Sequence, residues 1–388
     1  MIGIASPKQR VIPFAIPAGF ILAASLFLAF GAVLLGLNPG ALAEARDPVT
    51  LTAAHLLILG FGVGVLMGAM HQLVPVVIEV QLPRPGWGYW TLGLWAGGLP
   101  FQLRGFLTGD PLLIAAGGAL VLLGILVFAA HMLFAFRAAA SWSPVHSGLA
   151  WVVAYLALTP TVGVLQALSM KFGSYDPDRI VVHAVVGLVG VFALAVFVVG
   201  HKLLAMFTLS HGGNDRVLGA LLWAVNGGIL ATALDARAGA VLLAAAYLLA
   251  ATDTALILRA RTKRPLDVGV RHYLLALGFL GLSGLAFLSG HPMAGGAWFL
   301  LGFLAIVVTG MLYKILPFLT WVHRYSGKVG KGSKVPLLRE MYPAWAPEAA
   351  MLLLAAGALL TPFTPLGVWL FAAGVVPFAY SILEVLNP

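Results

Sequence analysis

The chain has 388 residues, of which 61% are hydrophobic and 9% are charged, and its mean hydropathy is +1.01. A soluble protein of this length cannot bury that much apolar surface in one core, so the composition excludes an ordinary soluble domain and indicates a polytopic α-helical membrane protein. A formal net charge of +9 is also typical of nucleic-acid-binding proteins, so the placement of the basic residues has to separate the two classes.

Twelve apolar stretches, taken in chain order, are each long enough to cross a hydrocarbon core of about 30 Å. The first follows Lys8 and Arg10 and shows no small-residue cleavage site, which predicts a retained helix rather than a signal peptide. We therefore predict an all-α protein with about 12 transmembrane helices in a single transmembrane domain, 1–388. The predicted helices are 11–36, 51–79, 87–107, 111–136, 146–170, 180–208, 216–234, 238–259, 271–290, 294–319, 345–362 and 365–386.

The basic residues between these stretches predict the orientation of the chain. With the N-terminus in the cytoplasm, 17 of the 22 Lys and Arg fall on the cytoplasmic side. This asymmetry follows the positive-inside rule. It predicts a multi-pass protein of the cytoplasmic (inner) membrane of a prokaryote with both termini in the cytoplasm, and it accounts for the basic charge without nucleic acid. The basic cytoplasmic loop at 321–344 is expected to face anionic lipid.

An internal repeat divides the predicted helices into groups of four. The sequence HLLILGFGVGVLMGAMHQLVP at 55–75 aligns without gaps with AWFLLGFLAIVVTGMLYKILP at 297–317, and His71 then matches Tyr313. The stretch at 183–207 looks like a third copy with a shifted spacing. Because these are the second, sixth and tenth helices, we predict three pseudo-repeated units, roughly 11–136, 146–259 and 271–386.

Two histidines near the outer ends of apolar stretches are candidate ligands. The chain has no cysteine, so a metal ion or a haem has to be held by His, Met, Tyr or carboxylates. Titratable side chains inside a bilayer are costly and usually functional. Two neutral imidazoles at matching depth, His55 and His183, can supply both axial ligands of a haem. The alternative is a pair of hydrogen-bonded interfacial histidines.

His71 and His201 form a second predicted pair, toward the cytoplasmic side. A metal site, a second haem and a proton-handling site are all open for this pair. On ideal helices His183 and His201 share a face whereas His55 and His71 do not, which argues against two stacked haems. His131 is either a further ligand or a packed core residue. Solvated positions at helix ends are expected for the remaining histidines, His146, His211, His272, His291 and His323.

Two segments resemble signatures of the NnrS family. In 55–75 a His precedes Gly-Phe and a Gly-rich apolar run that closes with Pro. From His183 to Gly213, a His-Ala and spaced glycines are followed by SHGG, where the family favours Gly in place of Ser210. The twelve-helix plan also resembles the catalytic subunit of haem–copper oxidases, whose helices 2, 6 and 10 are related by pseudo-threefold symmetry. No His precedes His323 in the tenth helix and none lies in the seventh, so the usual binuclear centre of those oxidases is not expected.

The resemblance implies a haem b protein, with one haem or two, that is associated with copper and with the response to nitric oxide. It assigns the haem to His55 and His183, and a second haem or copper to His71, His201 and His211. Arg179 and Arg104 lie on the outer side and are candidate partners of haem propionates, although an ion pair of Arg179 with Asp176 or Asp178 is the simpler expectation.

Electron transfer or nitric oxide and redox handling is therefore the leading expectation, with a redox protein or a quinol as the partner. If the protein is an enzyme, a membrane oxidoreductase is expected. The alternative is a haem-free transporter in which the buried histidines, Asp253 and Lys314 handle protons or a metal ion. Repeats that all run in one direction favour the oxidase-like plan, because inverted repeats are common in transporters.

Overall fold

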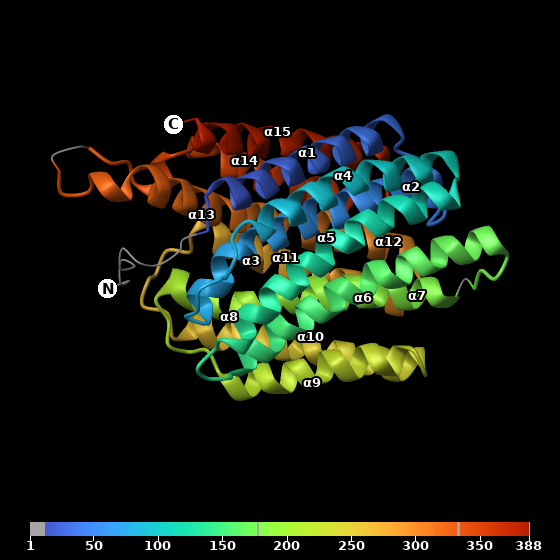
Figure 1. Ribbon diagram of the computed structural model, residues 1–388, viewed down its shortest axis with the longest axis horizontal. Helices are drawn as coiled ribbons and strands as arrows, with labels where there is room; N and C mark the ends of the chain where they lie inside the picture. The colour runs from blue at the N-terminus through green and yellow to red at the C-terminus, as the bar shows by residue number, and fades with distance from the viewer. Residues whose placement is uncertain (1–11, 177, 332–333, 388) are drawn as a thin grey trace.

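The structure is a computed structural model that describes residues 12–176, 178–331 and 334–387. These residues form a bundle of antiparallel helices joined by short connections (Figure 1). Helical segments occupy all twelve predicted places, within a few residues of the predicted bounds. They are α1 (Ala15–Leu37), α2–η2–α3 (Pro48–His55, Leu56–Gly62, Val63–Val77), α4 (Trp87–Thr108), α5 (Pro111–Arg137), α6 (Pro144–Phe172), α7–η3–α8 (Asp178–Val185, Val186–Ala193, Leu194–Thr208), α9 (Asp215–Thr232), α10 (Ala236–Arg259), α11 (Val268–Leu288), α12–η4–α13 (Pro292–Ala297, Trp298–Leu304, Ala305–Arg324), α14 (Trp345–Leu360) and α15 (Pro365–Leu386), with short 3₁₀ turns η1 (Ala41–Ala43), η5 (Ser326–Lys328) and η6 (Leu338–Glu340).

Nine helical segments of the described chain are long and apolar enough to cross a membrane, which supports a polytopic helical membrane protein. Of the other three, α14 is apolar but short, and α4 and α9 fall outside these nine segments. A count of twelve membrane crossings therefore stays a prediction.

Local signals in the sequence set the helix ends. Asp47 and Asp110 each accept hydrogen bonds from two backbone N–H groups at the start of α2 and α5, and a proline follows each of them at the first helical position. At the C-terminal ends of α4 and α6, Gly109 and Gly173 have φ angles of 65° and 74°, a left-handed conformation that glycine adopts without steric cost. These caps explain why the predicted bounds are accurate to a few residues.

Three long helices contain a π-helical segment in their N-terminal half. These segments are η2, η3 and η4, which interrupt the second, sixth and tenth helical segments. A π-helix hydrogen-bonds from residue i to i+5, so the segment turns each following residue away from its ideal α-helical direction. On ideal α-helices, His183 and His201 would share a face and His55 and His71 would not. That prediction does not apply to these helices, because η2 separates His55 from His71 and η3 separates His183 from His201.

Within each π-helical segment a glycine allows a neighbouring helix to approach closely. An aromatic ring or its Cβ occupies the space that a Cβ atom would need at Gly60, Gly190 and Gly302, and the rings belong to Phe27 of α1, Tyr155 of α6 and Phe279 of α11. Equal numbers of residues separate these three glycines from His71, His201 and Tyr313. His55 and His183 do not share a common spacing to their glycines.

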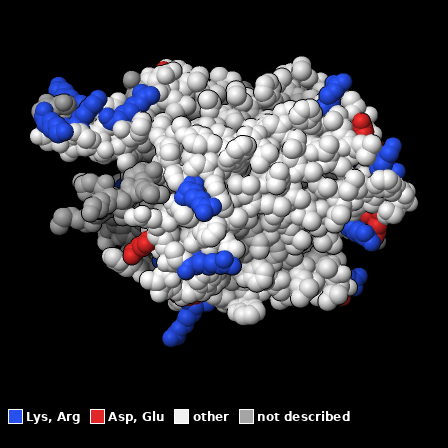
Figure 2. All heavy atoms as spheres, in the orientation of Figure 1, with Lys and Arg blue, Asp and Glu red and all other residues white. Residues whose placement is uncertain are grey.

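The basic residues lie mainly at the ends of the bundle. We call the end that carries residues 325–331 and 334–344 the basic end; the last residues of α15 also lie there (Figure 1). On the face shown in Figure 2, Lys and Arg gather at the two ends, and almost all of the surface between is formed by other residues. The helices α2 and α7, which contain His55 and His183, lie toward the opposite end (Figure 1).

Candidate functional site

His55 is the last residue of α2, directly before the π-helical segment η2. Its ring is half-buried, and its Nδ1–H donates to the carbonyl oxygen of Leu51, 2.7 Å away. The ring of Phe106 from α4 lies 4.4 Å from the imidazole, centroid to centroid. The hydrogen bond assigns the proton to Nδ1, so the Nε2 lone pair is available to a ligand.

His183 has the same hydrogen-bond arrangement from a different helix. Its Nδ1 lies 3.0 Å from the carbonyl oxygen of Thr159 in α6. A Cβ atom at Gly163 would lie 3.0 Å from the imidazole Cε1, so the missing side chain at this position leaves room for the ring. His183 lies on α7 and His55 on α2. Within the described residues, neither Nε2 has a hydrogen-bond partner.

His71 lies between α1, α4 and α5, and its side chain is fully buried. Its Nδ1 lies 2.7 Å from the carbonyl oxygen of Met67, and its Nε2 has no hydrogen-bond partner in the described chain. Phe20 and Phe128 pack against the ring at 5.7 and 5.3 Å. Among the described residues, the other titratable ring in contact with it is that of His131, whose centroid lies 5.5 Å away.

His131 of α5 lies next to His71. It is fully buried, and its Nε2 lies 2.6 Å from the carbonyl oxygen of Pro83. Its Nδ1 has no partner among the described residues. The structure therefore brings together two buried imidazoles, each with one nitrogen bound to a carbonyl and the other free.

His201 is in a different environment, so the predicted pairing of His71 with His201 is not what the contacts show. Its Nδ1 lies 2.8 Å from Oδ2 of Asp253, and its Nε2 lies 3.3 Å from Oδ1 of Asp215. Asp253 is buried, whereas the Asp215 side chain is 59% exposed. Both ring nitrogens of His201 therefore face carboxylates, which leaves neither free for a metal ion in this arrangement. His211 is exposed.

Two other histidines differ from the solvated positions that the sequence suggested. His272 is fully buried because Gly310 of α13 has no side chain and lets α11 approach closely. His146 is 7% exposed because its Nδ1 closes the N-terminal cap of α6 with Ser143. The expectation of exposure is correct for His211, His291 and His323.

The remaining predicted side chains have separate partners. The Nε of Arg179 lies 3.3 Å from Asp176, which confirms the simpler expectation for this arginine, and Arg104 is exposed. Lys314 binds Asp267 with a distance of 2.8 Å between its Nζ and Oδ2. Tyr313 packs against His272, with 5.9 Å between the ring centroids.

No protein-family model and no curated protein matches this chain. The geometry of its own residues therefore carries the functional argument. In the described part of the chain no group of three or more His, Asp or Glu side chains is arranged to hold a metal ion. The candidate ligand sites among the described residues therefore contain two histidines each, and a haem needs no more than two protein ligands.

Sequence reasoning undervalued His131, Asp215 and Asp253 as partners of the buried histidines. A histidine within a 27-residue apolar helix was the available signal for His131. For Asp253 it was a carboxylate within the predicted helix 238–259. Neither signal names its partner, because the partner depends on which helix packs alongside.

Proposed function

We propose that the protein is a haem b-binding integral membrane protein in which His55 and His183 are the axial ligands. One observation carries this proposal: the two imidazoles lie on α2 and α7, toward the same end of the bundle (Figure 1), each with Nδ1 bound to a backbone carbonyl and, within the described residues, Nε2 without a partner. A hydrogen bond at Nδ1 fixes the ring orientation and makes Nε2 a better ligand. A haem bound there supplies one-electron redox chemistry, which fits electron transfer or nitric oxide and redox handling.

Haem retention in alanine variants tests the ligands. The haem content of purified protein is measured by the pyridine haemochrome method for the wild type, His55→Ala and His183→Ala, with His291→Ala as the control. His291 is an exposed histidine in the connection between α11 and α12. Both ligand variants should lose most of the haem while the control keeps it. Full haem content in all variants would mean that His55 and His183 are not the haem ligands.

An architecture of three four-helix units, similar to the NnrS family and to the catalytic subunit of haem–copper oxidases, is part of this proposal. It is supported by the three π-helical segments in the second, sixth and tenth helical segments and by the glycines that admit an aromatic ring in each. An experimental structure in which the three units fail to superpose would contradict it.

The predicted second metal, a haem or copper, is better placed at His71 and His131 than at His201 and His211. The reason is the donor set: His71 and His131 each have a free nitrogen, whereas both nitrogens of His201 face carboxylates. Metal analysis of purified His131→Ala checks this assignment, because copper content equal to that of the wild type would exclude His131 as a ligand.

The second candidate function is a haem-free proton- or metal-coupled transporter. It is favoured by the His201 site, in which a buried imidazole joins the exposed carboxylate of Asp215 to the buried one of Asp253. Such a chain of titratable groups is suited to proton transfer between solvent and the protein interior. A visible spectrum without a haem band, together with proton movement in vesicles, would favour this function.

Location in the inner membrane with cytoplasmic termini belongs to the proposal as well. It rests on the charge asymmetry of the loops. A reporter enzyme fused after residue 388 checks the orientation, since a reporter that is active only in the cytoplasm should be active there.

A further inference from the structure

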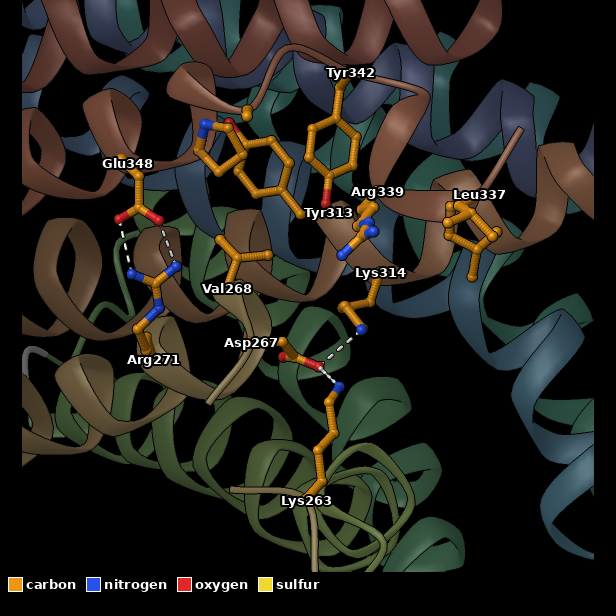
Figure 3. A pocket seen from close by; sticks show the side chains of 13 residues that line it. Lys263, Asp267, Val268, Arg271, Tyr313, Lys314, Leu337, Arg339, Tyr342 and Glu348 are labelled. Atoms are coloured by element: carbon orange, nitrogen blue, oxygen red, sulfur yellow. Dashed lines mark hydrogen bonds and ion pairs between the residues drawn. The ribbon is translucent and has the colours of Figure 1, made fainter. Parts of the chain in front are cut away.

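A cavity of about 520 Å³ opens at the basic end of the bundle (Figure 3). Its walls come from the N-terminal end of α11, from α13, from the 3₁₀ turn η6 and from the start of α14. Neither the proposed haem site nor the His71–His131 pair takes part in it. A volume in this range is typical of sites that hold a small molecule or a headgroup.

Six charged side chains line this cavity, and the cations outnumber the carboxylates. They are Lys263, Lys314, Arg271 and Arg339 against Asp267 and Glu348. With all six ionised the lining therefore carries a net charge of two positive units. A cavity with an excess of positive charge attracts and holds anions.

The ion pairs within the cavity do not use up all of its positive charge. Glu348 is matched by Arg271, which donates two hydrogen bonds to it. Asp267 is shared by two cations, since its Oδ2 lies 2.8 Å from Nζ of Lys314 and 3.5 Å from Nζ of Lys263. Arg339 has no ion pair within the described residues.

Arg339 and Tyr342 point into one part of the cavity. Figure 3 shows the Arg339 guanidinium and the Tyr342 hydroxyl in this part, next to the Lys314 ammonium that binds Asp267. Burial and the nearby charge of Asp267 raise the pKa of Tyr342 to about 12, so its hydroxyl remains a hydrogen-bond donor at neutral pH. Arginine, lysine and hydroxyl donors arranged in this way suit the oxygens of a phosphate group.

We propose that this cavity binds a phosphate group, contributed by the headgroup of an anionic phospholipid. The position favours a lipid over a soluble phosphate compound, because the cavity lies where α11, α13 and α14 meet the basic loop. Apolar side chains at its rim are exposed, with Leu337 at 55% and the neighbouring Trp345 at 59%. Exposed tryptophan and basic pockets at helix ends are typical of the membrane interface and of headgroup recognition.

The test is a titration of the full-length purified protein in detergent. Thermal unfolding is followed by tryptophan fluorescence as short-chain phosphatidylglycerol, short-chain phosphatidylcholine or inorganic phosphate is added at constant ionic strength. A ligand that binds the folded state raises the apparent Tm. Phosphatidylglycerol should raise it at lower concentrations than phosphatidylcholine does.

Arg339→Ala and the control Lys331→Ala assign the effect to the cavity, and Tyr342→Phe tests the hydroxyl group. Arg339→Ala should raise the half-saturating phosphatidylglycerol concentration about tenfold, the usual effect of losing one charged hydrogen-bond donor. Lys331→Ala removes another exposed cation of the same loop, outside the cavity, and should change this concentration little. Tyr342→Phe should weaken binding about threefold, as expected for one neutral hydrogen bond.

Each outcome has a defined meaning. An Arg339-dependent effect with phosphatidylglycerol alone supports the lipid headgroup. The same Arg339-dependent effect with inorganic phosphate keeps the phosphate site and overturns the lipid as its source. Equal effects of phosphatidylglycerol and phosphatidylcholine, or equal losses in Arg339→Ala and Lys331→Ala, would overturn the site.

Discussion

At His201, burial should decide how much each carboxylate partner contributes to the stability of the fold. The same imidazole contacts Asp253, whose side chain is 7% exposed, and Asp215, whose side chain is 59% exposed. An ion pair in water contributes little because solvent screens it, whereas removing one member of a buried pair leaves the other without compensation. The two carboxylates therefore form a matched comparison around one histidine.

We predict that Asp253→Asn lowers the free energy of unfolding by about 3–5 kcal/mol and that Asp215→Asn lowers it by less than about 1 kcal/mol. Thermal unfolding of the purified variants in detergent checks both values. Equal losses in the two variants would show that His201 does not depend on the buried carboxylate.

The sequence allowed His55 and His183 to be named as candidates but not their surroundings. A histidine in an apolar stretch is visible in any sequence, since its cost inside a membrane follows from residue type alone. The carbonyl that binds Nδ1 of His183 is not visible in the sequence, because Thr159 lies on another helix. Nor could the partner of His71 be found, since the approach of α5 that brings His131 near depends on helix packing.

At the scale of the elements, helix bounds were predictable and helix faces were not. Caps such as Asp47–Pro48 act on their immediate neighbours, so the local sequence determines where the helix begins. The direction in which a residue points depends on every turn before it, and the π-helical segments η2, η3 and η4 change that direction. Gly60, Gly190 and Gly302 mark these segments, yet glycine is too frequent in membrane helices to predict them alone.

Gly60 should tolerate no side chain. A Cβ atom there would lie 2.6 Å from the Cβ of Phe27, so α1 would have to move. We predict that Gly60→Ala costs about 1–3 kcal/mol of unfolding free energy, as over-packing does. Gly97 of α4 is the control because nothing lies within 4 Å of its Cβ position. Gly97→Ala should be neutral or stabilising by up to about 1 kcal/mol. A Gly60→Ala protein that unfolds at the wild-type temperature would contradict the close packing of α1 on η2.

The N-terminus of α11 should make stability depend on pH in acid. Burial raises the pKa of Asp267, but the hydrogen bond and charge of Lys314, the N–H of Val270 and the charge of Lys263 outweigh it and hold this pKa below its ordinary value of 3.8. A carboxyl with a lowered pKa in the folded state contributes stability that is complete above pH 3.8 and is lost as the pH falls through the folded-state value.

Asp267→Asn should therefore lower the apparent Tm at neutral pH and flatten its fall below about pH 4. The measurement is the apparent Tm of both proteins between neutral pH and the acid limit of the detergent sample. Parallel curves for the wild type and the variant would mean that Asp267 contributes nothing to the acid response.

At the scale of the whole molecule, composition was sufficient for the class of protein. A chain that is 61% hydrophobic and has only 9% charged residues indicates a helical membrane protein, and nine described segments are long and apolar enough to cross a bilayer. The cavity at the basic end was beyond sequence reasoning. It joins residues of α11, α13, η6 and α14, and only the folded chain brings Lys263 and Glu348 to the same space.

The central claim is a haem held by two histidines at the end of the bundle opposite the basic loop. The visible absorption spectrum of the wild-type protein, purified after expression with added haem precursor, tests it most directly. We predict a Soret band and a haem b spectrum that carbon monoxide leaves unchanged after reduction, because in the proposed site His55 and His183 would both bind the iron and leave no open position. A protein that shows no Soret band under these conditions would contradict the account.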